Sequence, residues 1–437
     1  MSASAGSSAP DAAPGDARRQ LGLRGAVGLG IGSMLGAGVF AVWGPATASA
    51  GRYVLIAVAV AALIAVCNAL STAALAARHP RAGGVYAYGR AEINPAAGYV
   101  AGLGFVIGKT ASLAAMGLTI GAYAWPGHEP QVATVALVAA WIINAKGVTR
   151  TAFVASVLGG VVLVSLAVFA AAGWSEPAGP PAAAPPPSTW WEALIQIGGG
   201  AAIIFFAFAG YARVATLGEE VREPRRVIPR AVAIAIAVVL LAYALVAVSL
   251  THRPGLAALP DSPAPIADMV RGSIVPVAAV SVVAGVAAFG AMVALAAGVG
   301  RTAMAMARER DLPGLLAREG SHGVPWLAEG LAILVAIALA WWGDLGLALA
   351  MSSFAVITYY AISNYAALRA FARPGDKTPR VARWIARIGL LGCVALALSL
   401  PLPAALLAIG LGLVALLVRW LGGWWSRSRA AFSRGGR

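Results

Sequence analysis

The sequence predicts an all-α membrane protein with twelve transmembrane helices. Sixty per cent of its 437 residues are hydrophobic and only 11% are charged, whereas charged residues make up about a quarter of a typical soluble domain. Apolar runs of roughly 20 residues, the length that crosses a bilayer as a helix, recur along the chain. The basic residues fall in alternate loops between these runs. Together these observations exclude an ordinary soluble enzyme.

The apolar runs define the predicted spans. Twelve runs can be placed, at about residues 25–49, 53–77, 97–124, 131–145, 151–173, 191–213, 229–250, 273–300, 325–342, 345–368, 385–400 and 403–421. Only Pro401-Leu402-Pro403 separates the last two runs, so that their separate count is left open.

The basic residues predict the orientation of the chain. With the N-terminus inside, Arg52, Arg253 and Arg271 lie outside and Lys109 lies within a span, which leaves 28 of the 32 Lys and Arg residues on the inner side. Basic residues favour cytoplasmic loops, so we expect a multi-pass protein of the cell (plasma or inner) membrane with both termini cytoplasmic. The net charge of +15 then indicates contact with anionic lipid head groups and not with nucleic acid.

The first span contains a glycine-rich interruption between Gly30 and Phe40. Gly32, Gly36 and Gly38 lie within it, and each glycine costs a helix roughly 1 kcal/mol relative to alanine. A broken backbone in hydrocarbon leaves N–H and C=O groups without partners, unless protein, water or a ligand supplies them. We interpret this stretch as the substrate-binding half-helix of a transporter.

The sixth span is also rich in glycine. Gly198-Gly199-Gly200 is followed by the run from Phe205 to Tyr211, Phe-Phe-Ala-Phe-Ala-Gly-Tyr. Aromatic residues among small ones are common in simple helix packing, and the glycines also permit close helix contact. However, two glycine-interrupted spans that lie five spans apart are what an inverted five-plus-five repeat predicts, with two broken helices meeting at the membrane midplane.

Lys109 is the basic residue that no interface explains. It lies about thirteen residues into the third span, near mid-membrane at 1.5 Å per residue. A lysine there costs about 2.5–3.5 kcal/mol on insertion scales and normally faces a cavity or a partner. Two readings remain open: a brace for the bundle, or a cation that stands in for a coupling ion or titrates during transport.

Several motifs together resemble the amino acid–polyamine–organocation (APC) superfamily of permeases. They are the glycine-rich stretch of the first span, the loop Pro80–Tyr86, the Phe-Ala-Phe-Ala-Gly run with Glu219–Pro224, and the segment from Arg301 to Pro313. The resemblance implies the leucine-transporter fold, with broken helices 1 and 6. The expected parts are a disordered cytoplasmic tail at 1–22, a ten-helix core at 23–371 with repeats at about 23–173 and 190–371, two peripheral helices at 372–421, and a basic cytoplasmic tail at 422–437.

The resemblance also implies a substrate site built largely from backbone atoms. Free amides of Leu35, Gly36, Ala37 and Gly38 would bind an α-carboxylate, as helix N-termini do, with Ser33 adding a hydroxyl. Carbonyls of Met34, Phe206, Ala207 and Ala209 would receive the α-ammonium, beside Gly210. Phe206 is the candidate aromatic lid, and Phe208 is the second choice. No catalytic residue, metal or cofactor is implied.

Two departures from relatives in that superfamily bear on specificity and coupling. The sixth span has no acidic residue before Glu219, which favours a neutral amino acid over a cationic one. The stretch Leu295–Gly300 lacks the hydroxyls that sodium-coupled relatives place there, and sodium needs oxygen ligands. The fifth span has no lysine to act as a sodium surrogate, which makes Lys109 the coupling candidate. We therefore expect proton-coupled or facilitative transport, with the proton as the candidate co-transported ion.

Three function classes were compared. The favoured one is a secondary amino acid transporter, and an exchanger or polyamine carrier of the same fold is the alternative. A membrane-embedded enzyme would need clustered carboxylates or histidines at one depth, but the four histidines fall in predicted loops on both sides. A channel would need rings or filters formed by oligomerisation, which no motif specifies. The sequence leaves the substrate's identity and the oligomeric state open.

Overall fold

The computed structural model describes residues 21–79, 83–147, 152–180, 187–211, 221–320, 323–376 and 378–434. These residues form helices joined by short turns, with one isolated parallel β-bridge between Leu21 and Val221. The predicted all-α class is therefore confirmed for the described part of the chain. The predicted tail at 1–22 lies almost wholly outside the described residues.

The helices follow the predicted apolar runs closely. Their order is α1 (Leu23–Met34), α2 (Gly38–Ala41), α3 (Trp43–Ala50), η2 (Gly51–Tyr53), α4 (Val54–Arg78), α5 (Gly84–Glu92), α6 (Pro95–Ala124), α7 (Glu129–Ala145), α8 (Ala152–Trp174), α9 (Trp190–Phe208), η3 (Ala209–Tyr211), α11 (Pro224–Leu250), η4 (Thr251–Gly255), η5 (Leu259–Asp261), α12 (Pro265–Met269), α13 (Val277–Arg308), η6 (Gly314–Ala317), α14 (Trp326–Trp342), α15 (Leu345–Phe371), α16 (Arg380–Leu398) and α17 (Leu402–Arg434).

Ten segments of the described chain are long and apolar enough to cross a membrane. Two further apolar helices, α7 and α14, have 17 residues each. At 1.5 Å per residue they are about 25 Å long, at the lower limit for the roughly 30 Å hydrocarbon core of a bilayer. The structure thus supports a multi-pass membrane protein with about ten spans. The count of twelve depends on α7 and α14.

The helix of the first span is interrupted at its glycine-rich stretch. Helix α1 ends at Met34 and α2 begins at Gly38. Between them Leu35 has φ −83° and ψ 47°, outside the helical region. The chain then continues through α2 into α3, so that one apolar run contains three helical pieces.

The sixth span is helical through its glycine triplet, so the structure shows no break there. Helix α9 runs through Gly198-Gly199-Gly200 without a break and ends at Phe208, where η3 begins. The triplet instead allows α3 to approach, because a Cβ on Gly200 would lie 2.5 Å from the Cβ of Ala50. The continuation of this span, at 212–220, lies outside the described residues.

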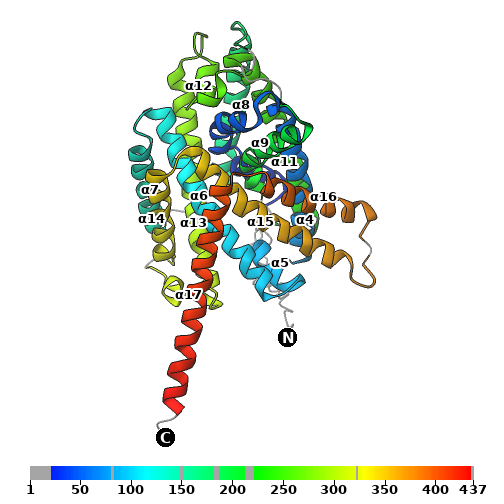
Figure 1. Ribbon diagram of the computed structural model, residues 1–437, viewed down its shortest axis with the longest axis vertical. Helices are drawn as coiled ribbons and strands as arrows, with labels where there is room; N and C mark the ends of the chain where they lie inside the picture. The colour runs from blue at the N-terminus through cyan, green and yellow to red at the C-terminus, as the bar shows by residue number, and fades with distance from the viewer. Residues whose placement is uncertain are drawn as a thin grey trace, which may run out of the picture.

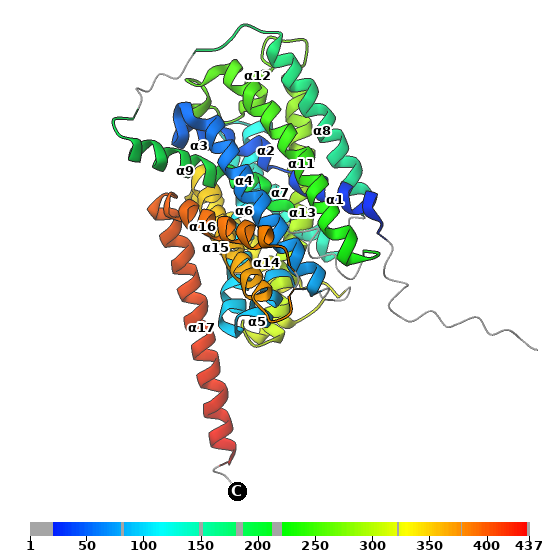
Figure 2. The ribbon, with the colours of Figure 1, turned by 90° about the vertical axis from the view of Figure 1, so that its right-hand side faces the viewer.

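The packing of the long helices pairs elements that are distant in sequence. Helix α4 packs against α11, α6 against α13, and α7 against α14. Helix α6 also packs along α15, and α1 packs along α8. In Figure 1, α12 lies at one end of the bundle and α5 towards the other, while α17 passes in front of the bundle and projects beyond the rest. Figure 2 shows the same projection of α17 from a perpendicular direction.

Two segments for which no helix was predicted are helical. The loop after the second span contains α5, which begins at Gly84, where φ is +54°. The basic segment 422–434, predicted as a tail, continues α17 as helix to Arg434. In both cases the sequence pattern gave the polarity of the segment but not its conformation.

Candidate functional site

The interruption between α1 and α2 leaves a run of free backbone amides. The Leu35 amide donates to the Ile31 carbonyl at 2.9 Å, which closes the last turn of α1, so the prediction that it is free is wrong. Within the described ranges, the next four amides have no hydrogen-bond acceptor: Gly36, Ala37, Gly38 and Val39. These donors lie at the start of α2, as predicted for three of the four.

Carbonyls at the ends of α1 and α9 lie on the same side of the site. The hydroxyl of Tyr243 on α11 lies 2.8 Å from the Met34 oxygen and 3.0 Å from the Ala207 oxygen. The Phe206 carbonyl accepts the Ala209 amide at the end of α9. One side chain from a third helix therefore contacts a carbonyl at the end of α1 and another at the end of α9.

The interruption of the first span touches the end of the sixth span through the backbone. A Cβ on Gly38 would lie 2.7 Å from the Cα of Ala207, and one on Gly210 would lie 2.2 Å from the Ser33 oxygen. The Ser33 hydroxyl lies 2.9 Å from the Gly30 carbonyl and 3.0 Å from the Gly210 carbonyl. Glycine at these positions allows the two backbones to approach closely. The Ser33 hydroxyl donates its proton to backbone carbonyls and does not offer it to a ligand.

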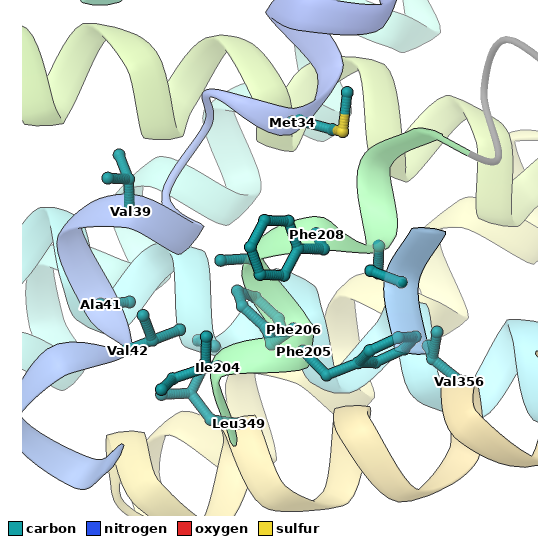
Figure 3. Packing of buried hydrophobic residues seen from close by; sticks show 14 of the residues in the cluster. Met34, Val39, Ala41, Val42, Ile204, Phe205, Phe206, Phe208, Leu349 and Val356 are labelled. Carbon is teal, nitrogen blue, oxygen red and sulfur yellow. The ribbon is translucent and has the colours of Figure 1, made fainter. Parts of the chain in front are cut away.

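Aromatic and apolar side chains enclose this junction. Met34 and Leu35 are each 2% exposed, Phe206 is 9% exposed, and Phe208 is fully buried. Figure 3 shows the thin connection between α1 and α2, with Phe208 between Met34 and Phe206. The Phe208 ring lies 4.9 Å from that of Tyr243. The predicted residues of both spans are thus brought together in one water-poor region.

Lys109 is buried in α6, as its place in the third span predicts. It is 9% exposed, and in the described part of the chain its ammonium group forms no hydrogen bond or ion pair. Its neighbour Gly108 lies against Ser352 and Val356 of α15. The structure is therefore compatible with both predicted roles of Lys109, as a brace for the bundle and as a coupling group.

Three buried tyrosines contact carbonyls of the interrupted helices, and the sequence reading missed them. Besides Tyr243, the Tyr360 hydroxyl of α15 donates to the Ala209 carbonyl at 3.3 Å, and the Tyr123 hydroxyl of α6 to the Phe40 carbonyl at 3.2 Å. A buried tyrosine hydroxyl normally finds a partner. Their sequence positions gave only a weak signal: Tyr243 and Tyr360 lie inside apolar spans, whereas Tyr123 lies one residue before the end of α6.

A buried carboxylate, Asp311, lies at the α5 end of the bundle. Asp311 is 2% exposed; it accepts a hydrogen bond from the Tyr86 hydroxyl at 2.9 Å and lies 3.0 Å from both Arg90 of α5 and Arg419 of α17. Burial raises the pKa of the Tyr86 hydroxyl, and the hydrogen bond to the Asp311 carboxylate raises it further. This cluster ties α5 and α17 to the loop after α13.

A second buried carboxylate, Glu92, lies at the C-terminus of α5. Its oxygens lie 2.6 Å from His79, directly after α4, and 2.7 Å from Arg373 after α15. Nearby, Arg78 pairs with Asp376 at 2.8 Å. Helix α5 is thus held by two ionic clusters.

Among the described residues, no three His, Cys, Asp or Glu side chains come together to hold a metal ion.

Residues 21–421, nearly the whole chain, match the family model for amino acid permeases. This chain belongs to the amino acid permease family. The permease is 44% identical over 415 residues to an uncharacterised transporter of Mycobacterium tuberculosis, covering 93% of this chain and 92% of that protein. The corresponding transporter of Mycobacterium bovis matches equally well.

A more distant relative has a more specific name. The cationic amino acid transporter 6 of Arabidopsis thaliana is 27% identical over 387 residues, covering 81% of the permease and 66% of that protein. These findings confirm the predicted superfamily and place the permease among transporters of the membrane rather than among enzymes. Family membership implies an amino acid as the class of substrate.

Proposed function

We propose that this permease is a secondary active transporter that moves a neutral amino acid across the cell membrane by alternating access. The observation that carries the proposal is the junction of the interrupted helices. Four acceptor-free amides there lie beside carbonyls from two separate elements. An amino acid zwitterion has the complementary pair of groups, a carboxylate acceptor and an ammonium donor.

The carboxylate is assigned to the amides of Gly36, Ala37, Gly38 and Val39. Buried amides without acceptors are costly, roughly 1–3 kcal/mol each, and a carboxylate can accept several hydrogen bonds at once. The ammonium is assigned to the carbonyls of Met34, Ala207 and Ala209, while Phe206 closes over the substrate. Ser33 and Gly210 hold the two elements together. This arrangement recognises the α-carboxylate and the α-ammonium group. The amino acid side chain then contacts the surrounding apolar residues.

The surroundings of the junction favour a neutral side chain. Within the described residues, the hydrogen bonds and ring contacts of the junction involve amides, carbonyls, hydroxyls and rings, and no carboxylate. A cationic side chain would need an acidic partner to offset its desolvation. The Arabidopsis relative is named for cationic amino acids, so arginine and lysine form the second candidate class.

The proposed coupling is by protons or absent, rather than by sodium. Support comes from Leu295–Gly300, where α13 offers no side-chain oxygen ligand, and from Lys109, a buried cation without a described partner. A hard cation such as sodium requires several oxygen ligands. A fixed or titrating ammonium removes the need for a metal ion.

The proposed topology has twelve spans, with an inverted five-plus-five repeat and both termini cytoplasmic. Counting α1–α3 as the first span, α4 and α11 are spans two and seven, α6 and α13 are three and eight, and α7 and α14 are four and nine. Each of these pairs packs together, and members of each pair lie five spans apart. That pairing is what two interlocked inverted repeats would produce. The basic ends would face anionic lipid head groups.

The test uses the purified permease reconstituted in liposomes. Each of the twenty amino acids is offered with and without an inward pH gradient, and with sodium or choline as the bulk cation. We expect uptake of one or more neutral amino acids that sodium does not change. Uptake limited to arginine and lysine would select the second class, and uptake that requires internal substrate would select exchange. No uptake of any amino acid would overturn the proposal.

A further inference from the structure

The hydroxyl of Tyr243 lies between carbonyls of the two interrupted helices. It is 2.8 Å from the Met34 oxygen at the end of α1 and 3.0 Å from the Ala207 oxygen in the last turn of α9. Tyr243 itself comes from α11 and is fully buried. A single side-chain atom from a third helix therefore joins the two elements that form the candidate substrate site.

The hydrogen-bonding capacity of this contact is unbalanced. A tyrosine hydroxyl has one proton to donate, whereas an ammonium group has three. Both carbonyls lie within hydrogen-bonding distance of the hydroxyl, so one proton is shared between two acceptors. A group with more donors at the same point would satisfy both carbonyls fully.

The other two tyrosines of the junction behave differently. Tyr360 contacts the Ala209 carbonyl at 3.3 Å, and Tyr123 contacts the Phe40 carbonyl at 3.2 Å. Tyr123 also accepts the Ile266 amide, which fixes it in the packing of α12. Each of these hydroxyls contacts one carbonyl of the interrupted helices. Tyr243 is distinguished because it contacts a carbonyl on each side of the junction.

We propose that the Tyr243 hydroxyl occupies the place of the substrate's α-ammonium group in the empty permease and gives up both carbonyls when the amino acid binds. This inference rests on the proposed function, which it deepens by naming the residue that competes with the substrate. The empty site is held closed by a neutral donor, and the bound site by a charged one. Hydrogen bonds from a charged donor are roughly twice as strong as neutral ones, so the exchange favours the substrate.

The displacement also involves Phe208. Its ring lies 4.9 Å from the Tyr243 ring at an interplanar angle of 47°. When the hydroxyl leaves the carbonyls, the Tyr243 ring turns against Phe208, at the end of α9. Substrate binding at the backbone is thereby linked to the packing between α9 and α11.

The test compares Tyr243→Phe with the unchanged permease in detergent, using the amino acid that the liposome screen identifies. Removing the competing hydroxyl should lower the Kd for the amino acid about tenfold, equivalent to 1.4 kcal/mol, and slow its release. The Kd of the des-amino analogue, the same carboxylic acid with hydrogen in place of the ammonium group, should not change. Tyr99→Phe is the matched control, since Tyr99 is also buried but lies against Arg419 of α17, away from the junction, and its loss should leave both Kd values unchanged.

A second measurement keeps Tyr243 in place. The full chain carrying 3-fluorotyrosine at position 243 is titrated with ligand and followed by fluorine NMR. The amino acid should move the resonance to a new position, and the des-amino analogue should not. A resonance that the amino acid leaves in place would overturn the inference, whether or not Tyr243→Phe folds.

The outcomes separate the inference from the function on which it rests. An unchanged permease that binds an amino acid, with equal or weaker binding by Tyr243→Phe, overturns only the displacement of the hydroxyl. An equal gain for the des-amino analogue has the same meaning, because the effect would then not depend on the ammonium group. If the unchanged permease binds no amino acid, the proposed function fails and this inference fails with it.

Discussion

Gly38 lies directly against the backbone of Ala207. A Cβ on Gly38 would come within 2.7 Å of the Ala207 Cα, a separation that main-chain atoms can relieve only by moving apart. Gly38 contributes a free amide of the α1–α2 interruption, while Ala207 contributes a carbonyl that Tyr243 contacts. The two groups assigned to opposite ends of the zwitterion are therefore in contact through one glycine.

Replacing Gly38 by valine should abolish amino acid binding while the protein still inserts into the membrane. The side chain would push α2 away from α9 and cover the amides that are assigned to the carboxylate. We expect a loss of uptake of at least a hundredfold in liposomes, with normal recovery from the membrane fraction. Gly285→Val on α13 is the control, since a Cβ there meets nothing within 4 Å. Normal uptake by Gly38→Val would remove the site assignment.

Lys109→Met should alter the pH dependence of uptake. A buried charge without a partner is costly, so the charge state of this side chain affects the packing between α6 and its neighbours. Methionine keeps the length of the side chain and removes the charge. We expect uptake to depend less on pH between 5 and 8, measured as initial rates in liposomes. If Lys109→Met instead lowers the melting temperature and leaves the pH profile unchanged, Lys109 serves only to brace the bundle.

The interruption of the first span could be predicted from sequence because glycine acts locally. Clustered glycines weaken a helix wherever it lies, and a broken backbone in a membrane implies a compensating partner. The residue at which α1 ends could not be predicted in the same way. The Leu35 amide still reaches the Ile31 carbonyl, so the free amides begin one residue later than expected.

The partners of that interruption could not be predicted, because they come from distant parts of the chain. Tyr243 lies 209 positions from Met34, and no local pattern distinguishes it from a tyrosine that packs against lipid. The glycine triplet of the sixth span was ambiguous for a related reason. A glycine in a span indicates either a close helix contact or a break in the helix. Here the contact with α3 shows that the triplet serves close packing.

The ionic clusters at the α5 end show the same limit. The sequence predicts Arg90 and Arg419 on the inner side of the membrane, but it does not show that both meet Asp311. Charge counts predict the side of the membrane and carry no information on pairing.

Asp311→Asn should destabilise the permease markedly. Asp311 is 2% exposed and pairs with two arginines that are about one-third exposed. Its neutralisation removes the acidic partner of Arg419 and leaves Arg90 with only its longer, 3.6 Å pair to Glu309. We expect a loss of about 3 kcal/mol, seen as a lower melting temperature in detergent. Glu319→Gln is the control, because its pair with Arg308 is exposed and should be worth less than about 1 kcal/mol. Equal shifts for the two variants would contradict the role given to Asp311.

The loop after α15 should stay attached to α4 between pH 5 and 8 and loosen only in stronger acid. Hydrogen bonds from Thr378, and then the Arg78 guanidinium at 2.8 Å, hold the pKa of Asp376 below its ordinary value. A carboxyl whose pKa is lowered in the folded state contributes stability above its unfolded pKa of about 3.9, and loses it as the pH falls through the lower folded value.

Hydrogen–deuterium exchange of the segment 372–379, corrected for the intrinsic pH dependence of exchange, should measure this attachment. We expect constant protection from pH 8 to 5 and a decrease below about pH 4. Arg78→Met should weaken protection already at pH 7, by about two- to fivefold, because a partly exposed pair contributes at most about 1 kcal/mol. Arg52→Met at the opposite end should leave this segment unchanged. Protection that already falls between pH 7 and 5 would contradict the role given to Asp376.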